Sequence, residues 1–160
     1  MQLRDMSMDD LELYRRMVLD PGMMAELGGP LPPDGVDQKV KEIVRDVEAG
    51  RIWYFVIVED GSDAGTVCVW DHEEDGETIT EIGWMVAPEF QGRGLASSAV
   101  REVLERARSE RRWTRIHAYP ATTNGASNAI CRKNGFAHVG ERDIVYVGRT
   151  LRCNEWVWAR

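Results

Sequence analysis

Two glycines two residues apart, Gly92 and Gly94, mark the most informative segment of this sequence. They stand in the run Gln91-Gly92-Arg93-Gly94-Leu95-Ala96, between a hydrophobic stretch that ends near Val86 and a stretch with helical spacing. Glycine lets the chain turn tightly, so that several backbone N–H groups can face one concave side. The start of a helix adds free amides and the positive end of its dipole. This pattern predicts a diphosphate site, to which Arg93 would add a charged contact.

Two other phosphate-binding loops do not fit this segment. Gly92-x-Gly94 lacks the third glycine of the dinucleotide-binding fingerprint, and the strand before it belongs to an antiparallel meander. No Gly-Lys-Ser/Thr follows, as a P-loop requires. A plain glycine turn into a helix is the alternative, but the Gln-x-x-Gly-x-Ala spacing and the preceding Pro88 favour a binding loop.

The composition narrows the classes of function. The chain has 160 residues, the size of one domain, which we expect to span 1–160. Its 20 Lys and Arg against 27 Asp and Glu give a net charge of −7. Nonspecific nucleic-acid binding needs a basic surface, so no nucleic-acid partner is expected. The charge fits a cationic partner such as an amine or a basic peptide, or it serves solubility alone.

The cysteines and the apolar runs bear on location. Cys68, Cys131 and Cys153 are odd in number and widely spaced, so they predict neither a disulfide framework nor a zinc site, and no metal is expected. Met1–Asp5 lacks the apolar core of a signal peptide, and runs such as Trp53–Val58 are too short to span a bilayer. We expect a reduced, cytoplasmic protein that does not bind membranes.

The glycine loop must be positioned by the elements around it. The segment before it predicts an antiparallel meander, with strands at Trp53–Val58, Gly65–Trp70 and Thr78–Ala87 and turns at Asp60–Asp63 and Glu74–Gly76. Earlier in the chain, the patterns predict a helix over Met8–Leu19 capped by Ser7, a loop at Gly28–Pro33, and a helix over Val36–Val47 ended by Gly50. Two helices and then an antiparallel meander are therefore expected before the loop.

The segment after the loop alternates between helix and strand. Apolar spacing predicts a helix over Ala96–Ala107, a strand at Arg115–Tyr119 and a short helix over Asn124–Asn134 ended by Gly135. Further strand candidates are Phe136–Gly140, Ile144–Val147 and Trp156–Trp158.

At these residues the sequence resembles the GNAT family of acetyl-CoA-dependent N-acetyltransferases. Gln91, Gly94 and Ala96 match the family motif Gln/Arg-x-x-Gly-x-Gly/Ala. The segment Asn124–Phe136 resembles the family's Asn-x-x-Ser/Ala helix that ends in Gly-Phe, and Met23–Pro30 is similar to the helix–loop region of the RimJ/RimL-type branch. The resemblance covers nearly the whole chain and is weakest at its start, where the first strand is short.

The resemblance implies an α/β (α+β) fold of defined architecture. Its sheet is mixed and mostly antiparallel, with helices on both faces. Two central parallel strands, here Thr78–Val86 and Arg115–Tyr119, splay apart and admit the pantetheine arm of acetyl-CoA. Splaying leaves backbone groups unpaired on the first of them.

The resemblance also assigns residues to acetyl-CoA, the expected co-substrate. Backbone groups of Trp84, Met85 and Val86 would meet the pantetheine arm, and Gln91, Gly92, Arg93, Gly94, Leu95, Ala96 and Ser97 the pyrophosphate. Asn124 would bond the arm, or it caps its helix. Ser127 and Asn128, one turn on, are weaker candidates. Arg132 and Lys133 either reach phosphates or form a solvated basic face.

The implied reaction is direct attack of a primary amine on the thioester in a ternary complex. Glu81 is the candidate general base, and Asp71, His72 and Glu73 are alternatives that a solvent-facing turn would explain as well. Many family members carry an acidic tyrosine seven residues after the asparagine, where this chain has Cys131. Either Cys131 donates the proton or it packs in the core, and solvent then protonates the thiolate. The Val86 amide would polarise the thioester.

The acceptor is left open by the sequence. The branch points to a protein N-terminal α-amine, with a small amine such as an antibiotic, polyamine or amino acid as the alternative. A noncatalytic acyl-CoA-binding module is a further alternative, because Cys131 replaces the tyrosine. The family builds its acceptor site from the segment equivalent to Met23–Asp34 and from the C-terminal hairpin, and it allows a homodimer.

Overall fold

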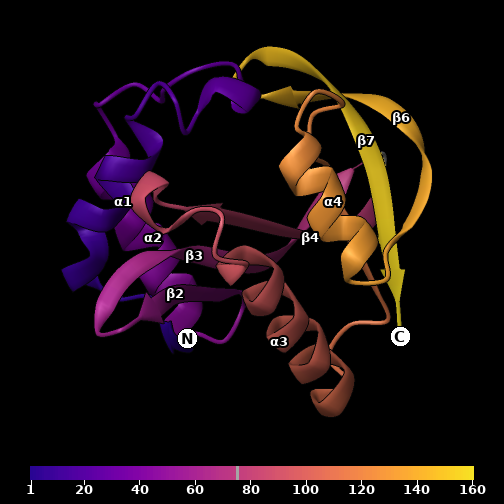
Figure 1. Ribbon diagram of the computed structural model, residues 1–160, viewed down its shortest axis with the longest axis horizontal. Helices are drawn as coiled ribbons and strands as arrows, with labels where there is room; N and C mark the ends of the chain where they lie inside the picture. The colour runs from indigo at the N-terminus through magenta and orange to yellow at the C-terminus, as the bar shows by residue number, and fades with distance from the viewer. Residues whose placement is uncertain (75) are drawn as a thin grey trace.

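A computed structural model describes residues 1–74 and 76–160 (Figure 1). Seven strands form one sheet in the order β1-β2-β3-β4-β5-β7-β6. The strands are β1 Gln2–Asp5, β2 Trp53–Glu59, β3 Ser62–Glu74, β4 Glu77–Val86, β5 Arg115–Ala118, β6 Ala137–Tyr146 and β7 Arg149–Ala159. The α-helices are α1 Leu11–Val18, α2 Val36–Glu48, α3 Leu95–Glu110 and α4 Gly125–Lys133, and the 3-10 segments are η1 Met8–Asp10, η2 Ala25–Leu27 and η3 Pro88–Phe90.

Helices cover both faces of the sheet, and each face has its own core. One core packs α3 and Cys131 of α4 on strand residues that include Phe55 and Val67. The other packs α1 and α2 on the opposite face, around Val56. A strand buried on both faces reads as a continuous hydrophobic run, which explains the composition of β2. Figure 1 shows α1 and α2 on one side of the molecule and the long β6–β7 hairpin on the other.

The pair β4 and β5 is parallel, and the other neighbouring strands are antiparallel. Glu81 and His117 form the single register pair between these two strands in the described residues. Both strands diverge beyond this pair, toward Val86 and toward Ala118. The predicted mixed, mostly antiparallel sheet with one central parallel pair is therefore confirmed.

Local signals at the helix ends are confirmed in detail. Ser7 and Asp10 form a capping box at the start of η1, which leads directly into α1. The helix α4 ends before Gly135, whose φ of 78° is the left-handed conformation of a helix stop. Among the described residues, no helix combines the length and apolar character that crossing a bilayer requires.

The C-terminal strands differ from the prediction. The two predicted strands at Phe136–Gly140 and Ile144–Val147 are parts of one continuous strand, β6 Ala137–Tyr146, apart from Phe136 and Val147 at their ends. The strand continues through charged residues because these pair with β7. The pairing of β6 with β7 shifts register between His138 and Gly140. β7 extends far beyond Trp156–Trp158, and β3 beyond Gly65–Trp70. The turn predicted at Glu74–Gly76 includes a residue outside the described ranges.

Candidate active site

The glycine loop forms a bowl of backbone amides at the start of α3. Gly92 and Gly94 have φ angles of 75° and 78°, which only glycine adopts without strain. A Cβ at either position would meet nothing within 4 Å, so the bowl opens to free space. The first bond inside the helix runs from the Ser98 N–H to the Gly94 carbonyl, and no side chain caps this end. The preceding amides therefore remain available to an anion.

Two side chains of the loop, Gln91 and Arg93, hydrogen-bond to the backbone just before it. Gln91 Nε2 donates to the Val86 carbonyl at 2.9 Å and ties the loop to the end of β4. Arg93 donates to the Glu89 carbonyl at 3.1 Å and lies over the Phe90 ring. Arg93 thus contacts the η3 turn, and its charged contact with a diphosphate stays a prediction.

The first turn of α3 also uses its side chains for packing. Leu95 belongs to the core, and Ala96 packs against it. Ser97 is buried, and its Oγ accepts a hydrogen bond from Asn134 Nδ2 at 3.2 Å. What Leu95, Ala96 and Ser97 present at the bowl is therefore the backbone N–H.

Alternate residues of β4 turn their backbone groups toward the diverging strand β5. In an antiparallel ladder every second residue bonds the partner strand. The Ala87 N–H donates to the Ala64 carbonyl, so Met85, paired with Thr66, also faces β3. A Cβ on Gly65 would collide with the Met85 carbonyl, in agreement with this direction. Trp84 and Val86 face the opening, and the expectation that Met85 shares this role is wrong.

The three polar candidates at the start of α4 have distinct environments, and Ser127 is half-buried. Asn124 caps the helix, with its Oδ1 accepting the Ser127 N–H at 2.9 Å. Asn128 is buried and uses its full capacity inside the protein. Its Nδ2 donates to the Ala121 and Asn124 carbonyls, and its Oδ1 accepts from Asn154 Nδ2 and Trp156 Nε1. Asn128 therefore ties α4 to β7, and its side chain has no hydrogen-bonding capacity left for the coenzyme.

Two further candidates on α4 lie apart from the bowl. Arg132 and Lys133 are exposed, and the Arg132 guanidinium lies 5.7 Å from the centre of the Trp156 ring. Arg132 lines a surface hollow between α4, β6 and β7, together with Gly125 and His138. The solvated basic face is the interpretation that this placement supports.

Glu81 is a largely buried carboxyl on β4, at the position where β4 pairs with β5. Its side chain is 23% exposed, and burial, followed by repulsion from Glu74, raises its pKa to about 7. His72 on β3 places Nε2 3.1 Å from Glu81 Oε2. A carboxyl that titrates near neutral pH is suited to accept a proton from an amine.

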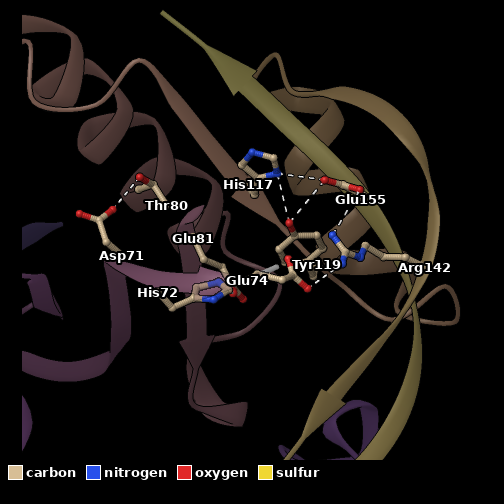
Figure 2. A network of polar contacts seen from close by, with 9 residues as sticks. All are labelled: Asp71, His72, Glu74, Thr80, Glu81, His117, Tyr119, Arg142 and Glu155. Atoms are coloured by element: carbon tan, nitrogen blue, oxygen red, sulfur yellow. Dashed lines mark hydrogen bonds and ion pairs between the residues drawn. The ribbon is translucent and has the colours of Figure 1, made fainter. Parts of the chain in front are cut away.

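The other two acid–base candidates on β3 lie outside this group. Asp71 accepts from Thr80 Oγ1 at 2.6 Å and from Trp113 Nε1 at 3.3 Å, on the opposite face of the sheet (Figure 2). Glu73 is exposed and accepts from Thr78 Oγ1. Strand alternation separates both from His72. Asp71 and Glu73 are solvent-exposed, as the alternative expected, but they belong to the strand β3 and not to a turn.

Cys131 is fully buried in the core beneath α4. Burial raises the pKa of its thiol to about 12, which makes it a poor proton donor. The packing interpretation is therefore correct, and the catalytic assignment of Cys131 is wrong.

A polar network that sequence reasoning missed lies beside Glu81 (Figure 2). His117 Nδ1 lies 3.0 Å from Glu155 Oε1 and 3.2 Å from the Tyr119 hydroxyl. Arg142 on β6 bonds Glu74 on β3 at 2.6 Å. Burial, followed by repulsion from Glu155, raises the pKa of the Tyr119 hydroxyl. These residues meet through strand pairing of distant segments, and no local motif signals them.

The loop between α1 and α2 reaches the β6–β7 hairpin over this face of the sheet (Figure 1). Arg149 Nη1 donates to the Gly29 carbonyl at 2.8 Å. Thr123 Oγ1, just before α4, donates to Glu26 Oε2. The segment Met23–Asp34 and the C-terminal hairpin are therefore in direct contact, which is the arrangement expected of an acceptor site.

Comparison with known proteins bears on this arrangement. Residues 1–137 match the family described as Acetyltransferase (GNAT) domain. The putative ribosomal N-acetyltransferase YdaF of Bacillus subtilis is 30% identical over 102 residues, which are 63% of this chain and 52% of that protein. The chain thus spans about half the length of this relative.

Solved structures share the fold at low identity. RimL, an alpha-N-protein acetyltransferase of a ribosomal protein solved with coenzyme A, has a TM-score of 0.81 at 18% identity, covering 98% of this chain and 92% of that one. The aminoglycoside acetyltransferase AAC(6')-Ib with coenzyme A has a TM-score of 0.75 at 18% identity, covering 99% and 94%. Since the family match extends over most of the 160 residues, the chain belongs to the GNAT family of acetyltransferases.

Proposed function

We propose that this protein transfers the acetyl group of acetyl-CoA to a primary amine, and that the amine is the N-terminal α-amine of a protein. The observation that carries the proposal is Glu81. A buried carboxyl with its pKa raised to about 7 lies where β4 and β5 diverge, on the strand that leads into the amide bowl. A base at this position can act on an amine held at the opening.

The residues present fit acetyl-CoA. The free amides of the bowl and the open space above Gly92 and Gly94 suit a diphosphate. The outward backbone of Trp84 and the N–H of Val86 suit the amide groups of a pantetheine arm, while the Val86 carbonyl accepts from Gln91. Asn124 caps the start of α4. Acetyl-CoA, when bound, supplies the acetyl group as a thioester.

The chemistry of the base favours an α-amine. An amine must lose a proton before it attacks. At pH 7 this costs about 4.6 kcal/mol for a lysine-like amine of pKa ~10.4 and about 1.4 kcal/mol for an α-amine of pKa ~8. A carboxylate of pKa about 7 is matched more closely to the α-amine. The names of YdaF and RimL support the same acceptor class.

A small amine is the second candidate acceptor. The structural likeness to an aminoglycoside acetyltransferase favours it, since the same fold serves that substrate class. A noncatalytic acyl-CoA-binding protein is the third reading, and the buried Cys131 keeps it open because the family's acidic tyrosine is replaced there.

The decisive experiment is a thiol-release assay with acetyl-CoA. Acceptors are peptides with free N-termini, the same peptides with blocked N-termini and an internal lysine, a polyamine and an aminoglycoside. We expect turnover with the free N-terminus and none with the blocked peptide. Glu81→Gln should lower kcat about tenfold to a hundredfold and abolish the rise of rate near pH 7, with normal coenzyme affinity. Coenzyme binding without turnover on any amine would support the noncatalytic reading instead.

A further inference from the structure

His72 is the neighbour of Glu81 that the proposed reaction leaves without a role. Its Nε2 is buried, lies 3.1 Å from Glu81 Oε2, and forms no aligned hydrogen bond within the described part of the chain. The rest of the imidazole reaches the surface, since its side chain is 35% exposed. We propose that His72 is a positioning residue for the base, which receives the proton from Glu81 at Nε2 and releases the Nδ1 proton to solvent. This inference rests on the proposed function.

The sheet fixes the contact between these two side chains. Glu81 is paired with Trp70 on β3, and His72 follows Trp70 by two residues. Residues two apart on a strand share a face, so His72 is the diagonal neighbour of Glu81 across the ladder. The pair therefore depends on the register of two central strands.

Neighbouring ionisable groups already have partners of their own. Glu74 is paired with Arg142 at 2.6 Å, and His117 with Glu155 at 3.0 Å. The remaining titratable groups on this face are Tyr14 on α1, Lys39 on α2, Tyr54 on β2, Cys68 on β3, Tyr119 just after β5, Tyr146 on β6 and Cys153 on β7. Cys68 Sγ donates to the Gly83 carbonyl. Of the groups on this face, His72 is the one whose side-chain nitrogen lies 3.1 Å from the Glu81 carboxyl.

The proton count closes with this route. The ammonium group of the acceptor gives one proton to the Glu81 carboxylate and becomes the neutral nucleophile. Glu81 passes that proton to the neutral Nε2 of His72, and Nδ1–H, on the other side of the ring, releases one to water. Glu81 is an anion again and His72 is neutral, now as the Nε2–H tautomer. Exchange of its ring protons with water restores the Nδ1–H tautomer before the next turnover. One proton is therefore released to solvent for each amine that is acetylated.

Two substitutions separate proton transfer from simple support of Glu81. His72→Gln retains an N–H that can bond the carboxylate but cannot carry a proton through the side chain. His72→Ala removes both functions and leaves a space that free imidazole can enter. His138→Ala is the matched control, because that histidine bonds Asn154 on the far hairpin and has no contact with Glu81.

The expected kinetic result is a change in kcat alone. His72→Gln should lower kcat about tenfold, with unchanged KM for acetyl-CoA. Imidazole in the buffer should restore much of the kcat of His72→Ala and leave His138→Ala and Glu81→Gln unaffected. Wild-type turnover in His72→Gln, or a folded His72→Ala that imidazole does not rescue, would overturn the proposal.

A second measurement does not depend on activity. Carboxyl NMR of protein carrying ¹³C-labelled glutamate follows the titration of Glu81, assigned with Glu81→Gln. In His72→Ala we expect the Glu81 midpoint to move downward, because the protonated carboxyl loses the Nε2 acceptor that lies 3.1 Å away. Identical Glu81 titration in both proteins overturns the proposal for His72. A midpoint that moves in His72→Ala, in a protein that acetylates no amine, contradicts the proposed function instead.

Discussion

Glu81 and His117 are register neighbours at the one parallel pairing found among the described residues, and β4 and β5 separate on both sides of them. Toward the glycine loop, the separation exposes the backbone of Trp84 and Val86. At the opposite end of the strands, a groove is lined by residues that include Thr78, Thr80, Thr114 and His117. The base therefore lies at the narrowest point between the two strands, where a group held by either end can reach it.

The buried Glu81 should make the protein less stable as the pH rises. Its pKa is about 7 in the folded chain against an ordinary value of 4.5, so the folded state holds the proton more tightly. This contribution to stability is complete below pH 4.5 and is lost as the pH rises to 7. Glu81→Gln should therefore be more stable than wild type at pH 8, by about 3 kcal/mol, and close to it at pH 4. Urea unfolding at both pH values measures the difference, and equal stability at pH 8 would show that the carboxyl is well solvated.

The parts of the fold that the sequence predicts are those with local signals. The Ser7 cap, the glycine loop, the helix stop at Gly135 and the meander before the loop are all specified by residues close together in the chain. Glu81 could be proposed as the base because its strand leads directly into the loop. Its raised pKa could not, since burial depends on the packing of α1, α2 and the hairpin.

The parts that the sequence does not predict depend on register between distant strands. The side chains of His117, Tyr119, Arg142 and Glu155 meet because β5, β6 and β7 are aligned in one particular way. The direction of the Met85 backbone also depends on register. The pairing of Met85 with Thr66 decides which residues of β4 bond β3 and which face away from it. Asn128 looked available for a ligand because its partners on β7 lie more than twenty residues away.

The amide bowl should lose its ligand when Gly94 gains a side chain. Gly94→Val forces a branched residue into a left-handed φ of 78° and fills the space above the loop. Gly35→Val is a matched control, since Gly35 also precedes a helix with a left-handed φ of 94° and open space around it. We expect both variants to lose similar stability. Acetyl-CoA should raise the melting temperature of wild type and Gly35→Val but not of Gly94→Val, and normal binding by Gly94→Val would place the diphosphate elsewhere.

Cys131 should matter for packing and not for turnover. Cys131→Ala removes a fully buried sulfur and should cost about 1 kcal/mol of stability, with kcat nearly unchanged. Cys131→Tyr should be strongly destabilised, because a ring does not fit beneath α4. Thermal unfolding and thiol release measure the two effects. A large loss of kcat in a folded Cys131→Ala would show that the thiol takes part in the reaction.

The contact between Arg149 and Gly29 should control the acceptor and not the coenzyme. Arg149 ties the hairpin to the loop between α1 and α2 through one hydrogen bond at 2.8 Å, and its methylene groups lie against Gly28. Arg149→Ala removes both contacts, so the segment that we assign to acceptor binding is held less firmly. We expect KM for the peptide to rise about threefold to tenfold, in line with the loss of about 1 kcal/mol expected for one hydrogen bond, while KM for acetyl-CoA stays the same. Arg152→Ala is the matched control, because Arg152 lies on the same strand and pairs with Glu141 and Asp143 on the hairpin surface. If Arg149→Ala and Arg152→Ala have the same peptide KM as wild type, the loop and the hairpin do not form the acceptor site. If both raise it equally, the hairpin as a whole matters and the contact with Gly29 has no special role.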